Sequence, residues 1–166
     1  MNPFIPEFDG QLELARVPDD FIARIRKRVE EGLLMRGNRK RANYAVRSAG
    51  NDEITFGAED FLTAYNVGLN DVSVRRSGAN TMRYHVTFWR WTLTAVVHGA
   101  ILGLAFLICF LTFQGLQRDV AAYAQGPLLF WGSVAFSSLL WPWIMTAVHR
   151  KFAEKALQRI LREVMS

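Results

Sequence analysis

The chain has 166 residues, of which 51% are hydrophobic, with 20 Lys and Arg against 15 Asp and Glu and a single Cys. This length suits one modest domain, but the charges are unevenly distributed. No Asp, Glu, Lys or Arg occurs between Arg90 and Arg118, and none occurs between Asp119 and Arg150. Two such gaps exclude a plain soluble globule, a disordered chain and a disulfide scaffold. The pattern predicts a small membrane protein with a polar N-terminal part.

The N-terminal part begins with residues 1–16, which mix Pro, Phe, Gly and acidic residues without a period, so we expect an irregular arm there. Over residues 18–36, apolar side chains recur every three to four residues, which predicts an amphipathic helix. Pro18 suits the first helical position, and Gly37 is a reasonable stop signal.

Period-two alternation follows and predicts two β-hairpins, one around the turn at residues 48–52 and one around the turn at 77–80. A short helix is expected between them, and Asn66, Gly68, Asn70 and Asp71 are interpreted as turn residues rather than a ligand loop. A helix packed on a half-covered sheet gives an α+β layer. Residues 1–90 are therefore predicted to form a small cytoplasmic α+β domain with one amphipathic helix and a four-stranded antiparallel sheet.

The two uncharged gaps predict two transmembrane helices, at residues 91–114 and 127–148, joined by an external connector at 115–126. Basic residues flank the outer ends of this hairpin, while the connector holds one Arg beside one Asp. Because basic residues favour the cytoplasmic side, we expect both termini in the cytoplasm and the protein in the cell (inner) membrane. Residues 149–166 are predicted to form a cytoplasmic amphipathic helix, either on the inner leaflet or over the open sheet face.

Small residues recur at four-residue spacing within both predicted spans. The first span carries Ala95, Gly99 and Gly103, and the second carries Ser133 and Ser137. Small residues allow close helix approach where no hydrophobic drive exists. We interpret this stripe as the packing seam of the hairpin in preference to a contact between copies.

No catalytic, cofactor-binding or metal-binding motif is recognisable in the sequence. The lone Cys109 lies in an apolar stretch, where a thiol is unreactive. His98 lies about two turns inside the first span and is a possible intramembrane polar site, for which a structural hydrogen bond is favoured over a cofactor or proton role. His85 is expected to be solvated and His149 to lie at the inner end of the second span.

A run of basic residues raises the possibility of nucleic-acid binding, which acidic neighbours weaken. Next to a membrane, such residues meet anionic lipid headgroups first. The residues expected to contact headgroups are Arg36, Arg39, Lys40, Arg41, Arg150 and Lys151.

The leading functional hypothesis is a non-enzymatic, membrane-anchored accessory or scaffolding subunit, with a protein partner or self-association and no nucleic acid. The alternative is an oligomeric pore or transport component packed through Ala95, Gly99 and Gly103, which the lack of charged pore-lining residues weakens. A third hypothesis is a haem-bearing redox subunit that uses His98.

Overall fold

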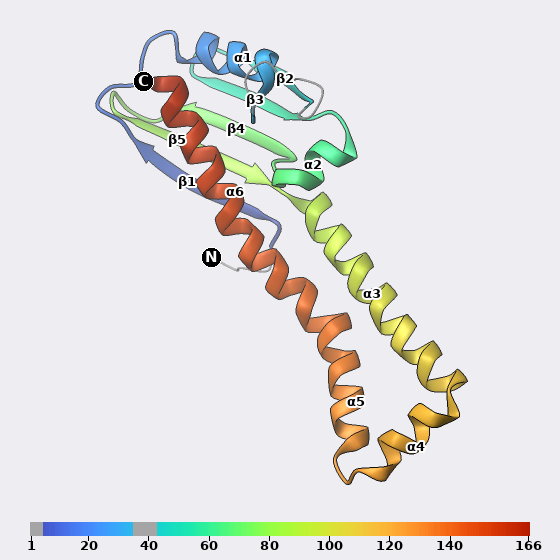
Figure 1. Cartoon of the computed structure of the whole chain (residues 1–166). Helices are drawn as coiled ribbons and strands as arrows, with labels where there is room; N and C mark the ends of the chain where they lie inside the picture. The colour runs from blue at the N-terminus through green and yellow to red at the C-terminus, as the bar shows by residue number, and fades with distance from the viewer. Residues whose placement is uncertain (1–4, 35–42) are drawn as a thin grey trace. The chain divides into compact units, whose positions relative to one another are not determined.

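The computed structural model describes residues 5–34 and 43–166 (Figure 1). Contacts divide the chain into two compact units. The first unit comprises Met1–Trp91 and Val148–Ser166, and the second comprises Thr92–Ala147.

The first unit is built on a five-stranded antiparallel sheet in the order β1-β5-β4-β3-β2. Its strands are β1 (Glu7–Glu13), β2 (Tyr44–Ala49), β3 (Glu53–Ala58), β4 (Asp71–Arg76) and β5 (Thr81–Thr87). The two predicted hairpins, β2–β3 and β4–β5, are present and lie side by side through the pairing of β3 with β4. The α+β class is therefore confirmed, while the predicted count of four strands is wrong.

The additional strand is β1, which replaces the expected irregular arm. Phe8 and Leu12 point into the core, whereas Glu7, Asp9 and Glu13 are exposed, so the segment has the period of two that a half-covered strand requires. It pairs with β5 and is the first strand in the sheet order. It therefore forms one edge of the sheet. Its acidic side chains suit an edge, because charge discourages pairing with another chain.

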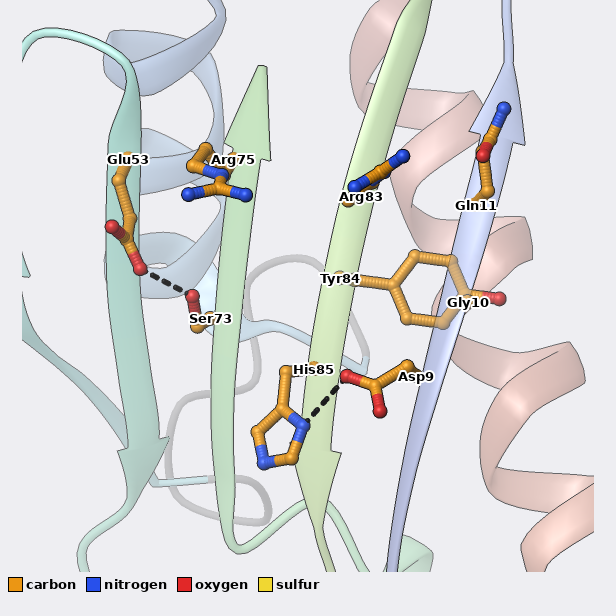
Figure 2. A pocket seen from close by; sticks show the side chains of 9 residues that line it. All are labelled: Asp9, Gly10, Gln11, Glu53, Ser73, Arg75, Arg83, Tyr84 and His85. Atoms are coloured by element: carbon orange, nitrogen blue, oxygen red, sulfur yellow. Dashed lines mark hydrogen bonds and ion pairs between the residues drawn. The ribbon is translucent and has the colours of Figure 1, made fainter. Parts of the chain in front are cut away.

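Two helices cover the same face of this sheet, as the ribbons behind the strands in Figure 2 show. The first is α1 (Phe21–Gly32), whose buried Phe21, Ile25 and Val29 face the sheet. The prediction of residues 18–36 was too long at both ends. The helix begins after Asp20, and Gly32 breaks it with a φ of 115°, a conformation that favours glycine. Gly37 lies outside the described residues.

The second covering helix is the C-terminal part of α6 (Trp141–Met165). From Val148 onward, α6 belongs to the first unit, where Ala153, Leu157 and Leu161 are buried in the shared core. Of the two positions considered for this segment, the sheet face is the one the structure gives. Burying one leucine contributes about 1.5–3 kcal/mol, so the buried residues of α6 stabilise the first unit.

Tyr84 of β5 connects the sheet to α6 through a space left by glycine. Its ring passes over Gly10 of β1, where any Cβ would overlap the ring. The hydroxyl accepts a hydrogen bond from Gln158 Nε2 at 2.7 Å and donates to Glu154 Oε1 at 3.2 Å. Burial raises the pKa of Tyr84, so the hydroxyl keeps its proton and can donate.

The second unit consists of helices. It contains α3 (Trp89–Thr112) from Thr92 onward, α4 (Gln114–Ala122), α5 (Gly126–Ala135), the π-helical turn η2 (Phe136–Leu140) and the first residues of α6. Two helical stretches, Trp89–Thr112 and Gly126–Met165, are long and apolar enough to cross a membrane. The connector between them was predicted only as an external link, and most of it is the helix α4.

Candidate functional site

The long helices of the second unit carry large apolar side chains on their surfaces. Among the residues of α3 only Thr92, Gly99 and Gly103 are buried, and α5 and η2, both fully described, contain no buried residue. The exposed side chains include Leu93, Val97, Ile101, Leu104, Ile108, Leu111, Leu128, Leu129, Leu139 and Leu140. A soluble monomer rarely exposes an apolar surface of this extent. This surface is therefore suited to a lipid or protein environment.

The small residues of α3 lie against the turn η2 and the start of α6. A Cβ on Gly99 would lie 2.6 Å from Pro142 Cγ and 3.0 Å from the carbonyl oxygen of Ser137. A Cβ on Gly103 would overlap the side chain of Ser138. Only glycine permits these approaches, so Gly99 and Gly103 allow α3 to pack closely against this segment.

The contact partner of the glycines is a π-helical turn that ends just before a proline. Pro142 has no N–H to donate to the carbonyl of Ser138, four residues earlier. The N–H of Trp141 donates to Phe136 O instead, which is the wider π-helical spacing.

One turn later, the buried Thr146 donates to Pro142 O at 2.9 Å and lies 3.4 Å from Thr92 Oγ1. The sequence analysis did not identify this threonine pair.

The other residues of the predicted stripe lie differently. Ala95 is half-buried, and Ser137 contributes its carbonyl oxygen to the contact with Gly99. Ser133 is exposed, and its hydroxyl donates to Leu129 O of its own helix at 2.8 Å. Beyond Gly103 the helices are joined by aromatic rings, and the centroid of Phe110 lies 4.8 Å from that of Phe130 in a tilted arrangement.

His98 is exposed on α3, and its Nδ1 donates to the carbonyl oxygen of Thr94, one turn earlier, at 2.8 Å. Cys109 is exposed as well. Within the described ranges 5–34 and 43–166, no group of three His, Cys, Asp or Glu side chains is placed to hold a metal ion. The geometry around His98 is thus that of a side chain bonded within its own helix.

The predicted headgroup-contacting residues fall into two groups. Arg36, Arg39, Lys40 and Arg41 lie outside the described residues. Arg150 lies over the ring of Phe8 at 5.8 Å from its centroid, and Lys151 is exposed.

His149 connects α6 to the C-terminal end of α2 (Phe61–Val67) within the first unit. Its Nε2 lies 3.0 Å from Val67 O, and its ring stacks on Trp91 at 4.1 Å. A Cβ on Gly68 would overlap the imidazole, and the φ of 76° at Gly68 also requires glycine. Burial lowers the pKa of His149, which lies beyond the apolar stretch 127–148, and the bond to Val67 opposes this effect.

The predicted turn after α2 has a structural role at two of its residues. Asn70 is buried, and its Oδ1 accepts a hydrogen bond from the backbone N–H of Arg90 at 2.9 Å. Asp71 forms an ion pair with Arg47 at 3.0 Å. The Asn70 side chain thus satisfies an N–H in the first turn of α3, which otherwise has no partner within the helix.

The second candidate site is the uncovered face of the sheet (Figure 2). A hollow of about 500 Å³ lies on it, lined by polar residues of β1, β3, β4 and β5. Strand register places Glu53, Arg75, Arg83 and Gln11 in one row across the four strands. The next row contains Thr55, Ser73, His85 and Asp9.

The second row has the residue types of a nucleophilic triad but not its hydrogen bonds. His85 Nδ1 lies 2.8 Å from Asp9 Oδ1, as an orienting carboxylate requires. However, Ser73 donates its proton to Glu53 Oε1 at 2.6 Å, so the hydroxyl is directed to the carboxylate and not to the imidazole. His85, expected to be solvated, is half-exposed, and its Nδ1 also lies within hydrogen-bond distance of Asp9. The signal that would have revealed this was β1, which the sequence analysis interpreted as irregular.

Comparison of the chain with protein-family models, with curated proteins and with solved structures finds no match. The class of protein is therefore defined by the fold and the two sites alone. It is an α+β layer joined to a pair of helices long and apolar enough to cross a membrane.

Proposed function

We propose that the chain is a non-enzymatic integral membrane protein with two spans, which serves as a membrane-anchored accessory or scaffolding subunit at the cytoplasmic leaflet. The observation that carries this proposal is the surface of the second unit, where apolar side chains point outward along two long helices. In lipid, exposing apolar side chains carries no free-energy penalty, because the lipid tails are as apolar as the side chains. The glycine contacts then hold the two helices together by close packing.

The orientation rests on basic residues. Arg83 and Arg90 precede the first apolar stretch, and Arg150, Lys151 and Lys155 follow the second. Both termini and the first unit would then face the cytoplasm at the inner membrane, with anionic headgroups as the first partner.

An apolar tip on the first unit supports its position at the membrane interface. Phe61 and Leu62 of α2 are exposed, as is Trp89 at the start of α3. The carbonyl of Asp60 accepts a hydrogen bond from Arg90 Nη1 at 3.4 Å, which ties α2 to the beginning of α3. Tryptophan and other amphipathic rings favour the headgroup level of a bilayer. The same patch would also suit a protein partner held at that level.

The pore alternative receives no support from the packing of the helices. Gly99 and Gly103, which that hypothesis assigns to contacts between copies, already lie against Ser137, Ser138 and Pro142 of the same chain. A second copy would have to displace these contacts.

Paired reporter fusions test the anchor and its orientation. A reporter that fluoresces only in the cytoplasm is fused after Ser166 of the full chain or after Gln125. We expect fluorescence from the Ser166 fusion alone. Fluorescence from the Gln125 fusion would contradict two spans with both termini inside.

The accessory role is tested by photo-crosslinking in native membranes from a reactive residue at Leu62, with one at Leu128 as the control. A discrete protein adduct from position 62 alone is the expected result. The proposal would be overturned if the purified chain alone converted a substrate and lost that activity in His85→Gln.

A further inference from the structure

Two arginines lie side by side at the centre of the uncovered sheet face. Arg75 of β4 is directly opposite Arg83 of β5 in the strand register, and both side chains are exposed. Side chains in this relation have Cβ atoms about 4.5–5.5 Å apart, and like charges there are destabilising. Neither guanidinium forms an ion pair with any residue in the part of the chain that the structure describes. The two guanidinium groups thus have no direct carboxylate partner in the described part of the chain, although Glu53 and Asp9 line the same hollow.

The acidic side chains around the pair are bonded to other groups. Glu53 is the register neighbour of Arg75, yet its Oε1 accepts the proton of Ser73 at 2.6 Å. Asp9 pairs with His85 at 2.8 Å (Figure 2). These bonds fix the carboxylates at the margin of the hollow and leave the guanidinium donors of Arg75 and Arg83 for a ligand from outside.

The hollow around the arginines has room for a small molecule. Its volume is about 500 Å³, within the range of about 300–1,000 Å³ typical of ligand pockets. Gln11 is opposite Arg83 in the register and adds a carboxamide to the same row. Because the lining side chains come from four paired strands, their positions are fixed by the sheet and not by a loop.

We propose that this hollow binds a phosphate group carried as a monoester, with Arg75 and Arg83 as its two ligands. A guanidinium presents a planar fork of donors that matches phosphate oxygens. A phosphate monoester offers three terminal oxygens, enough for two forks, whereas a carboxylate offers two. Bound phosphate also removes the repulsion between the arginines. The phosphate is supplied either by a soluble metabolite or by the headgroup of a monoester phospholipid. The inference stands on the first unit and is independent of the proposed membrane role.

Calorimetric titration of the full chain in nanodiscs tests this site. The probe is glycerol 3-phosphate, and the discs contain only zwitterionic phosphatidylcholine. We expect saturable binding by the wild type, and Arg75→Gln and Arg83→Gln each to weaken it at least about tenfold, or about 1.4 kcal/mol. The matched control is Arg26→Gln on α1, which removes another exposed arginine, one outside the hollow, and is expected to leave the affinity unchanged.

A second set of discs that contain phosphatidic acid separates the two phosphate sources. If the lipid headgroup is the ligand, it occupies the hollow and suppresses the titration with glycerol 3-phosphate in the wild type. If the ligand is soluble, the titration is the same in both discs. Either result supports a phosphate site.

The proposal is overturned if no binding occurs in phosphatidylcholine discs, or if all three arginine variants lose the same affinity. Unfolding monitored by circular dichroism confirms that the variants fold, which is expected because both arginines are exposed. Relief of the like-charge contact should leave each variant at least as stable as the wild type.

Discussion

The two units place the same residue types in opposite positions. In the part of the chain that the structure describes, every buried hydrophobic core residue belongs to the first unit, including Phe56 and Leu157. In the second unit, leucines such as Leu104 and Leu139 are exposed and the buried positions of α3 are glycine and threonine. A core that collapses in water puts apolar groups inside, whereas a helix pair in lipid puts small residues inside. The contrast implies two different solvents for one chain.

The largest expected effect comes from truncating one leucine in each unit. Leu157→Ala removes a fully buried side chain from the core between α6 and the sheet, so we expect the free energy of unfolding to fall by about 2–5 kcal/mol. Leu139→Ala changes a side chain that is 64% exposed and leaves that free energy almost unchanged. Urea unfolding in detergent, followed by circular dichroism, measures both. Equal losses of unfolding free energy in the two variants would contradict the difference in burial between the two units.

A charge introduced at an exposed leucine distinguishes exposure to water from exposure to lipid. Leu62 of α2 is 77% exposed and Leu104 of α3 is 57% exposed. Leu104→Arg should disfavour membrane insertion by about 2.5–3.5 kcal/mol, while Leu62→Arg should have little effect. The measurement is the fraction of chain that resists alkaline extraction from membranes. Full retention of Leu104→Arg would count against lipid around α3.

Enlarging a glycine sharpens the assignment of the seam within the second unit. Gly99→Leu forces atoms into Pro142 and the carbonyl of Ser137, and we expect a loss of about 1–3 kcal/mol in the stability of the helix pair. Gly132→Leu is the matched control, because a Cβ there meets no atom within 4 Å. The yield of an engineered disulfide between α3 and α5 reports the pairing. If the disulfide yield is the same in Gly99→Leu and Gly132→Leu, the two helices do not pack through Gly99.

The smallest expected effect is a pH dependence of the first unit from His149. Because burial lowers the pKa of His149 in the folded state, the unfolded chain takes up the proton first. The stability from this group is complete above the ordinary value of 6.5 and is lost as the pH falls through the folded-state value. His149→Gln, which can still donate to Val67 O, should flatten the unfolding midpoint over this acidic range. An unchanged pH profile in the variant would rule out His149 as the source.

The hairpins and the apolar helices were predictable because each is encoded in a continuous stretch of sequence. The hairpins show alternating apolar and polar residues, and the helices are long stretches without charge. β1 was missed since its pattern is short, contains Gly10, and has its partner β5 about seventy residues away. The contact between Asp9 and His85 was hidden for the same reason. By contrast, the pairing of Arg75 with Arg83 can be predicted from the sequence. Counting residues outward from the β4–β5 turn along both strands places the two arginines opposite each other. The π-helical turn beside Gly99 depends on tertiary packing that no local pattern records.

Labelling of the only cysteine tests the central claim most directly. Cys109 is exposed on the surface of the second unit, so its reaction with a reagent reports the medium around that surface. A membrane-impermeant maleimide is applied to opened membranes that expose both faces. The reference is a variant with Cys109→Ala and Ser48→Cys, which moves the thiol to β2 of the first unit. The account predicts that Ser48→Cys reacts and that Cys109 reacts only after detergent is added. Rapid labelling of Cys109 in intact lipid would contradict it.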